Sequence, residues 1–569
     1  MLNIKDISKR AVVLLLSVLT GLSAISHNDM AMPLKIPLYL SANFGELRSG
    51  HFHGGLDFKT QGKEGESLYS PADGYISRVG ISSAGYGNSL YITHFNGYTT
   101  VFGHLKNFIP AVADTLRSYQ YEHRLFAVDL SFSKEHFPVK KGDLIGYSGN
   151  TGYSYGPHLH FELRRTSNNN LLDPLPVFMS RIVDTTPPRA TKIKLYPQPG
   201  KGVVDGSVQD KIITLSQGRI DNPNVTPLVW GRVGFGISAY DYMDGTTNKY
   251  GVRRVDLYVD NRLIFQSLVD SFSFDQNKYI DAWTDYAEQS LNGEWYMRSH
   301  ILPENPLNIL WADSLRGILD VTEERVYNIR YELTDLYNNR SVYNFQIKGV
   351  REEIFAVDTL SPLYLRCGRA YIRYLGSAYI QLPHDALYDN TFLVAASYRK
   401  FRPDLSLGRV YILSHRPVPL KNRALLSIKI DSVPLFNQDK YYICKVKESS
   451  CIYVGGDYSH GVVSTYINSL ESYSIDIDTL GPTITVIDKN LWSLRRKISL
   501  NLSDDKTGIS NYNCFIDDEW VLFSYNSLRK RLECDLKELK LTEGSHILKI
   551  EATDLRGNST FFNVDFLID

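Results

Sequence analysis

The sequence has no excess of charge of either sign. Its 569 residues include 62 Lys and Arg against 62 Asp and Glu, so the formal net charge is +0 at pH 7. Proteins that bind nucleic acid through its phosphates carry a basic surplus. The balance argues against a nucleic-acid partner, while 43% apolar and 22% charged residues are typical of a folded globular protein.

Long apolar runs are absent after the first thirty residues. At the N-terminus, three basic residues precede the apolar run 11–22, and small residues follow at 23–26. That run is too short to span a bilayer comfortably, so residues 1–26 are predicted to be a signal peptide. An uncleaved membrane anchor is the alternative. Export to the periplasm or cell envelope is expected.

Cysteine is scarce: there are five, all beyond residue 366, and none has the spacing of a zinc finger. Metal binding through cysteine is therefore not expected. In an exported protein, Cys444–Cys451 and Cys514–Cys534 are candidate disulfides that leave Cys367 unpaired. Five free thiols are the alternative.

The length predicts three or four domains. Residues 33–180 alternate short β-type runs with Gly, Asp-Gly and Asn-Gly turns and show no convincing helical periodicity, and the chain carries 38 tyrosines. An all-β fold is expected. The predicted units are the signal peptide 1–26, a first domain 33–180, a β-sandwich with an insertion 185–349, a β-rich region 350–480 and a β-sandwich 481–569.

A weak internal repeat supports the two sandwiches. Residues 323–349 resemble 543–569, and residues 237–260 resemble 498–517. The repeat aligns Asp335 with Asp554 and Asn339 with Asn558. Both copies fit an immunoglobulin-like β-sandwich; a chance similarity of two hairpins is the alternative.

Histidines gather in three segments of the first domain, 51–57, 101–105 and 156–162. On a β-strand, residues two apart point to the same face, so His158 and His160 should project together. His53 and Asp57, four apart beside two glycines, should also share a face. Two neighbouring strands can thus bring His53, Asp57 and a histidine of the H-x-H pair to one point.

Two imidazoles and one carboxylate form the ligand set of a catalytic Zn²⁺ whose fourth position is left for water. Zinc acidifies that water and polarises a carbonyl, so hydroxide can attack an amide near neutral pH. The sequence lacks H-E-x-x-H, so a glutamate base on a helix is not available. The remaining histidines are suited to acid–base work.

The stretch 47–165 resembles the lysostaphin-type zinc metalloendopeptidases, a family of cell-wall peptidases with a duplicated-hybrid-motif β fold. The family's H-x-x-x-D motif matches His53 and Asp57, and its H-x-H motif matches His158 and His160. The resemblance implies one Zn²⁺ per chain, held by His53, Asp57 and His160. It implies His158 as the general base and His104 as a group that contacts the water or the oxyanion.

The resemblance further implies an endopeptidase that hydrolyses peptide cross-links of bacterial peptidoglycan, with an envelope regulatory protein as a candidate partner. A non-catalytic envelope protein or hydrolase activator is one alternative, and a peptidase of glycine-rich proteins is another. No substrate-binding residue and no oligomeric state is assigned.

Other polar residues have structural interpretations. His51 is expected in a hydrogen-bonded loop or beside the ligands, and His94 in a hairpin. Glu162 follows the implied ligand His160, should point away from it and should form a structural salt bridge. The glycine-containing loop 149–156 is a candidate groove wall, in which Tyr153 or Tyr155 is a candidate for contact with substrate.

Overall fold

The computed structural model describes residues 30–216, 219–220, 226–399, 409–430, 436–447 and 450–569. The signal peptide predicted at 1–26 lies outside the described residues. Within them, no helix is both long and apolar enough to cross a membrane. Strands dominate, as the all-β prediction requires.

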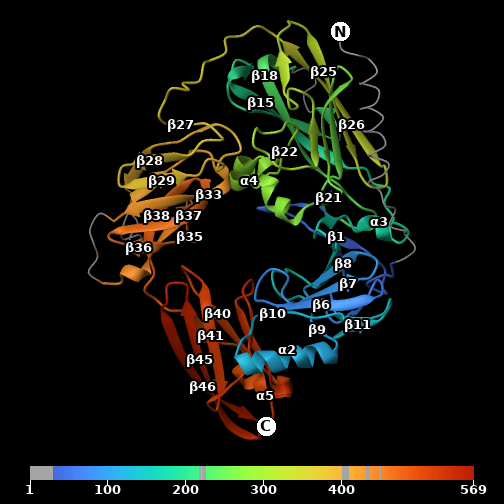
Figure 1. The fold of residues 1–569 in the computed structure, drawn as a ribbon, viewed down its shortest axis with the longest axis vertical. Coiled ribbons are helices and arrows are strands. Elements are labelled where there is room, and N and C mark those ends of the chain that lie inside the picture. Colours follow the sequence, from blue (N-terminus) through green and yellow to red (C-terminus); the bar gives the residue numbers. More distant parts are fainter. Residues whose placement is uncertain (1–29, 217–218, 221–225, 400–408, 431–435, 448–449) are drawn as a thin grey trace.

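The N-terminal domain, residues 33–180, is built on a ten-stranded antiparallel sheet (Figure 1). The main path of the sheet runs β1 (Leu40–Ala42), β4 (Leu56–Lys59), β13 (His158–Arg165), β8 (Tyr98–Gly103), β7 (Ser89–His94), β6 (Gly74–Ile81) and β10 (Val128–Ser131). Beside β6 lies β11 (Pro138–Val139), and β13 continues through β14 (Leu171–Leu172) to β21 (Ser271–Phe272). Smaller sheets join β5 (Ser67–Tyr69), β12 (Leu144–Tyr147) and β9 (Asn107–Phe108), and β2 (Leu47–Arg48) with β3 (His51–Phe52).

One long helix interrupts this β domain. Helix α2 (Pro110–His123) begins with proline at its first turn, where a missing N–H costs nothing, and ends at Arg124 in the left-handed conformation. It buries only Val112, Leu116 and Gln120. An apolar stripe of two residues is too weak to stand out, which explains why the sequence shows no convincing helical periodicity there.

Strands β4 and β13 are held together from the face opposite to their polar side chains. Phe58 of β4 and Phe161 of β13 both contact Phe178 of the short helix α3 (Leu175–Phe178), with ring centroids 5.5 and 5.6 Å apart respectively. Each such aromatic pair contributes about 0.5–1.5 kcal/mol beyond the area that it buries. This cluster fixes the register of the two strands that carry the histidines.

The second domain, residues 185–349, is more continuous than a two-sheet sandwich, because its long strand β18 pairs with β15 along its length and with β26 in parallel at its start. The sheet consists of β17 (Arg219–Ile220), β16 (Lys211–Ser216), β15 (Arg189–Val204), β18 (Leu228–Tyr240), β26 (Arg340–Gly349), β25 (Val326–Thr334), β19 (Arg254–Val259), β20 (Arg262–Leu268) and β23 (Leu310–Ala312), with β22 (Met297–Arg298) and β24 (Leu319–Val321) on β18. The insertion expected in this domain contains η1 (Phe274–Ala282) and α4 (Tyr286–Asn292).

The first two domains share one hydrophobic core. Strand β21 of the insertion extends the N-terminal sheet, and Phe272 of that strand stacks on Phe44 with ring centroids 4.8 Å apart. The boundary near residue 185 therefore does not separate two independent cores.

The third domain, within 350–480, has two five-stranded sheets around its own core. One contains β28 (Tyr371–Leu375), β29 (Ala378–Leu382), β33 (Val418–Lys429), β37 (Val462–Leu470) and β36 (Asp457–Ser459); the other contains β31 (Ala396–Arg399), β32 (Arg409–Ile412), β38 (Ser472–Ile477), β34 (Tyr441–Val446) and β35 (Cys451–Gly455). A short pair, β27 (Tyr364–Leu365) and β30 (Thr391–Phe392), lies beside them. The predicted disulfide Cys444–Cys451 joins β34 to β35.

The C-terminal domain, residues 481–569, packs two four-stranded sheets face to face. One contains β39 (Thr483–Val486), β40 (Lys497–Ser503), β44 (Arg531–Asp535) and β43 (Ser524–Asn526); the other contains β42 (Glu519–Trp520), β41 (Ile509–Ile516), β45 (Gly544–Asp554) and β46 (Ser559–Ile568). The predicted pair Cys514–Cys534 is wrong: both are buried free thiols in the core of this domain. Cys367 is free, as expected.

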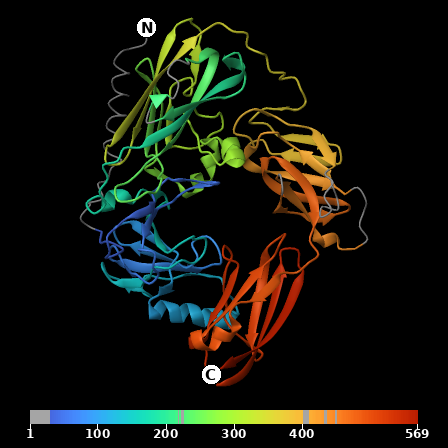
Figure 2. The ribbon, with the colours of Figure 1, turned by 180° about the vertical axis from the view of Figure 1, so that it is seen from behind.

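The four domains are arranged in a ring, which both ribbon views show (Figures 1 and 2). The second domain contacts the third through Tyr286, whose hydroxyl donates to Glu471 Oε1 at 3.1 Å. The third contacts the fourth through Lys440 Nζ, which donates to the carbonyl of Arg556 at 2.6 Å.

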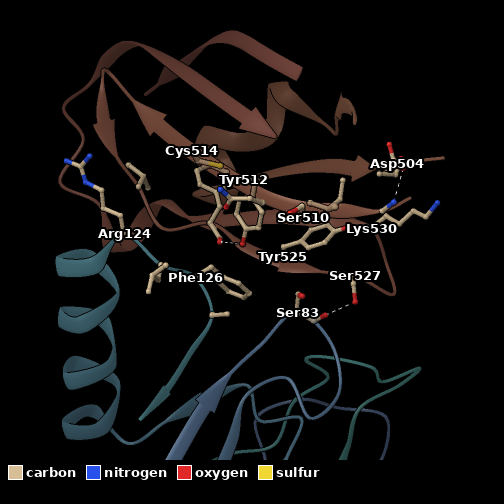
Figure 3. A pocket seen from close by; sticks show the side chains of 18 of the residues that line it. Ser83, Arg124, Phe126, Asp504, Ser510, Tyr512, Cys514, Tyr525, Ser527 and Lys530 are labelled. Atoms are coloured by element: carbon tan, nitrogen blue, oxygen red, sulfur yellow. Dashed lines mark hydrogen bonds between the residues drawn. The ribbon is translucent and has the colours of Figure 1, made fainter. Parts of the chain in front are cut away.

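The ring closes where the C-terminal domain meets the N-terminal domain. The Ser527 amide and hydroxyl both donate to the Ser83 carbonyl, at 3.1 and 2.9 Å (Figure 3). Asn526 Nδ2 donates to the Gly152 carbonyl at 3.1 Å, and Arg117 of α2 pairs with Glu538. A cavity of about 410 Å³ lies at this interface and contains none of the predicted site histidines.

Candidate metal centre

The strand pairing brings the predicted ligands together. Strands β4 and β13 are antiparallel, with His160 directly opposite Asp57, and on the other side of β13 the last residue of β8, Gly103, is opposite His160. His53 lies between β3 and β4. The adjacent strands β4 and β13 therefore supply Asp57 and His160, as side-chain facing predicted, whereas His53 comes from the loop that precedes β4.

Three ligand atoms converge within this group. Asp57 Oδ1 lies 3.0 Å from His53 Nε2 and 2.8 Å from His160 Nδ1, and the two nitrogens are 3.0 Å apart. A tetrahedral zinc with bonds of about 2.0–2.1 Å holds neighbouring ligands roughly 3.3 Å apart. The observed triangle is close to that size, so the three residues fit the metal.

Hydrogen bonds on the far side of each ring decide which nitrogen faces the centre. His53 Nδ1 donates to the carbonyl of Asn43 at 2.6 Å, because a carbonyl can only accept. His160 Nε2 donates to Glu162 Oε1 at 2.9 Å. Each neutral ring then has a lone pair on its inward nitrogen. Two such lone pairs facing a carboxylate oxygen require a cation or a proton between them.

The pKa values of His160 and Asp57 reflect this requirement for positive charge between the three groups. Burial lowers the pKa of His160, but its hydrogen bonds to Asp57 and Glu162 outweigh burial and raise the pKa to about 9. Burial raises the pKa of Asp57, but His53 and His160 hold it well below its usual range. A divalent metal held by these three groups would compete with a proton for the same atoms.

The expectation that Glu162 points away from the ligand His160 is wrong. Glu162 accepts from the ligand His160 and from Tyr86, and it forms the expected salt bridge with Arg164. The strand alternation places His158, His160, Glu162 and Arg164 on one face, so the same rule that paired the histidines could have found it. Burial raises the pKa of Glu162, but His160 and Arg164 outweigh it and lower the pKa to about 2.

His158 and His104 face the centre without belonging to the ligand triangle. His158 Nδ1 donates to the carbonyl of Gly156 at 2.8 Å, and its Nε2 lies 3.7 Å from Asp57 Oδ1. His104 Nδ1 donates to the carbonyl of Thr151 at 2.8 Å, and its ring centroid is 4.7 Å from that of His158. Both rings therefore have an Nε2 lone pair available.

Burial keeps these two histidines neutral. It lowers the pKa of His158, and together with the neighbouring His158 and His160 it lowers the pKa of His104 to about 3. His104 also has a positive φ of 62°, a conformation that is rare for residues other than glycine. Its backbone is held by Tyr86, whose carbonyl accepts from the His104 amide at 2.8 Å. Strained positions of this kind cluster at functional sites.

Close backbone approaches at the site require glycine. A Cβ on Gly55 would lie 2.2 Å from the carbonyl oxygen of Phe161, so a side chain there would push β4 away from β13. Gly87 and Gly152, both with positive φ, bring the loops around Tyr86 and Tyr153 into contact, and a Cβ on Gly87 would lie 2.4 Å from the Gly152 nitrogen.

The other histidines and the two tyrosines singled out from the sequence lie outside the ligand triangle. His51 is exposed, bonds the Ser49 carbonyl and is outside the ligand triangle. His94 is buried in its hairpin between the Ala72 carbonyl and Thr100 Oγ1. The two tyrosines expected in a groove wall, Tyr153 and Tyr155, are exposed, and their hydroxyls are 3.0 Å apart.

Comparisons with known proteins place the centre within a recognised domain. Residues 51–121 and 117–174 match peptidase family M23, and this stretch contains all five predicted site residues. Residues 369–478 match a Zu5-like domain.

Curated relatives are similar over the same part of the chain. An uncharacterized metalloprotease of Haemophilus influenzae is 32% identical over 125 residues, 22% of this chain and 21% of that protein. The DD-carboxypeptidase/endopeptidase Mpg of Neisseria meningitidis is 32% identical over 118 residues, 21% of each chain. Glycyl-glycine endopeptidase ALE-1 of Staphylococcus capitis is 31% identical over 135 residues, 23% of this chain and 30% of that protein. The similarity thus spans between about a fifth and a third of each relative.

Among solved structures, the catalytic domain of lysostaphin from Staphylococcus simulans is 26% identical and covers 24% of this chain and 86% of that chain, with a TM-score of 0.18.

Proposed function

Because residues 51–174 form a peptidase family M23 domain, we propose that this protein is a zinc-dependent endopeptidase that hydrolyses peptide cross-links of bacterial cell-wall peptidoglycan. The observation that carries the proposal is the convergence of the His53, Asp57 and His160 ligand atoms within 3.0 Å of one another. Two further neutral histidines border that point.

Bound zinc would supply an acidified water and a Lewis acid for the scissile carbonyl. The chain supplies the rest of the chemistry. Glu162 and the Asn43 carbonyl orient the two ligand imidazoles, so that each presents its inward nitrogen without rearrangement. The Asp57 carboxylate supplies the one negative charge of the ligand set.

The proton path runs through His158 and His104. A neutral imidazole with its Nδ1–H committed to a carbonyl can accept a proton only at Nε2, and in both residues Nε2 is the nitrogen left for the site. Once protonated, the same nitrogen becomes a donor. His158 can therefore take a proton from the attacking water and return it to the leaving amine, while His104 Nε2 accepts a hydrogen bond from that water.

The substrate class and the compartment belong to this proposal too. The named activities of the curated relatives, DD-carboxypeptidase/endopeptidase and glycyl-glycine endopeptidase, support a peptide substrate of the cell wall. The Cys444–Cys451 disulfide supports an oxidising compartment outside the cytoplasm. The signal peptide and the immunoglobulin-like relationship of the sandwiches stay predictions.

Zinc content and wall hydrolysis measured together test the proposal. We expect purified full-length protein to contain about one zinc per chain and to release peptides from purified peptidoglycan, as read by mass spectrometry. Asp57→Ala should lose both, whereas the control His123→Ala, an exposed histidine of α2, should lose neither. Zinc-loaded protein that cleaves no wall peptide would favour the non-catalytic alternative, and cleavage of glycine-rich proteins alone would change the substrate.

A further inference from the structure

Three buried aspartates lie close together at the ends of strands of the second domain. Asp184 precedes β15, Asp241 follows β18, and Asp335 follows β25. They are 5%, 3% and 2% exposed, and one carboxylate oxygen from each lies within 4.8 Å of the others. Ionised carboxylates so close together repel one another, and burial makes each charge costly.

Their hydrogen bonds leave this charge uncompensated. Asp335 accepts from the backbone and side-chain nitrogens of Asn339, both at 2.8 Å. Asp184 Oδ1 accepts from the Thr186 amide at 2.9 Å, but the buried Asp184 Oδ2 has no partner among the described residues. Asp241 Oδ1 accepts from the Tyr242 amide at 2.9 Å. An orphaned carboxylate oxygen inside a cluster of three carboxylates is where a cation belongs.

The pKa values of these aspartates also indicate uncompensated negative charge. Burial, and then the neighbouring Asp335, raise the pKa of Asp241 to about 8 and that of Asp184 to about 6. Without a cation, the cluster would have to take up protons near neutral pH.

The C-terminal domain contains a second copy of this arrangement, in which a hydroxyl group donates to the carboxylates. Asp478, Asp504 and Asp554 occupy the matching places, and Asn558 bonds Asp554 as Asn339 bonds Asp335. In this copy the Thr507 hydroxyl donates to Asp478 Oδ2 at 2.7 Å and lies 3.4 Å from Asp504 Oδ1.

The first copy has a cavity beside its three aspartates. It measures about 10 Å³ and is lined by all three aspartates. Arg253 is the one cationic side chain among its lining residues, and it lies beside Asp173, whose pKa it lowers against the larger effect of burial. The space is about that of a single small sphere.

We propose that Asp184, Asp241 and Asp335 bind one Ca²⁺ ion, at a site separate from the zinc centre. A donor set of oxygens alone suits a hard cation and not zinc, which prefers nitrogen and sulfur. Ca²⁺ accepts monodentate and bidentate carboxylates in flexible geometry, whereas Mg²⁺ demands a near-ideal octahedron with short bonds.

The calcium site adjoins the segment that orients a zinc ligand. Asn43 lines the same cavity, its carbonyl accepts from His53 Nδ1, and its side chain exchanges two hydrogen bonds of 2.9 Å with Gly251. Bound calcium thus stabilises the contact between the first two domains on which the orientation of His53 depends.

Calorimetric titration of the zinc-loaded full-length protein with Ca²⁺ tests this site, together with thermal unfolding. We expect one Ca²⁺ per chain and a midpoint of unfolding that rises with calcium. Asp241→Asn should abolish both effects while zinc stays at one per chain, and Asp184→Asn is a second variant should the first not fold. The control Asp504→Asn, in the hydroxyl-compensated copy, should bind calcium as the parent does.

Three results would overturn the assignment. They are no calcium binding by the parent at millimolar concentration, unchanged binding by both cavity variants, or a preference for Mg²⁺. None of them depends on hydrolytic activity, so a failure of this site is distinguishable from a failure of the proposed enzyme function.

Discussion

Replacing Glu162 with glutamine changes one atom of a side chain that supports both a zinc ligand and a buried arginine. Glu162 is 1% exposed; its Oε1 accepts from His160 Nε2 at 2.9 Å, and its Oε2 accepts from Arg164 Nε at 2.7 Å. Glutamine has one acceptor oxygen. It can serve the histidine or the arginine, and its amide then faces the other as a second donor.

The structure sets the size of the two effects. Loss of the partner that orients a metal-binding histidine typically weakens metal binding 10–100-fold, about 1.4–2.7 kcal/mol. Removing one partner of a buried ion pair costs about 3–5 kcal/mol, because the remaining charge is left uncompensated. Glu162→Gln should therefore bind zinc 10–100-fold more weakly and lose a few kcal/mol of unfolding free energy.

Competition with a zinc chelator measures the affinity, and denaturant unfolding measures the stability. The matched control is Asp129→Asn, which breaks the exposed pair between Arg78 and Asp129 on the same sheet and should cost about 1 kcal/mol or less. Zinc binding by Glu162→Gln as tight as that of the parent would refute the orienting role of Glu162.

Four other predictions concern separate parts of the chain. Burial lowers the pKa of His94 to about 4, from a value near 6.5 in the unfolded chain. Between these two pH values the unfolded state binds more protons than the folded state, so the denaturant midpoint should fall as the pH drops from 6.5 to 4. His94→Gln should lessen that fall. Burial also lowers the pKa of His158, so the midpoint of the acid-side fall in kcat/KM should lie below pH 6.5, and a midpoint above pH 7 would contradict this. Gly55→Ala, whose Cβ would overlap the Phe161 carbonyl, should unfold at a lower temperature than Gly156→Ala, where a Cβ meets open space and the backbone has no positive φ. The double variant Ser83→Cys, Ser527→Cys should form a disulfide that closes the ring, visible as altered mobility without reductant; failure to cross-link would mean that the ring is open in solution.

Side-chain facing on strands predicts the metal centre well, because alternation is a local property of the chain. Spacing alone pairs His158 with His160 on one face of β13, whereas His53 reaches Asp57 from the loop before β4, which strand alternation does not describe. It does not say which histidine of the pair binds metal. That depends on Glu162 and Gly156, which fix the outward hydrogen bond of each ring.

Contacts between residues that are far apart in the sequence cannot be predicted from a local pattern. The contact of Ser83 with Ser527 closes the ring across 444 positions of sequence, and no local pattern encodes it. The repeat does align Asp335 with Asp554, and both make the same bonds to an asparagine. It does not show that only the second copy has a hydroxyl, since that difference comes from Thr507 alone.

Paired substitution of the two H-x-H histidines, with zinc content and peptidoglycan hydrolysis measured on each full-length variant, tests the central claim most directly. His158→Ala should retain about one zinc per chain and lose hydrolysis, because His158 Nε2 faces the site from outside the ligand triangle. His160→Ala should lose both, because its Nδ1 lies 2.8 Å from Asp57 Oδ1 within that triangle. Zinc lost from His158→Ala and retained by His160→Ala would contradict the account.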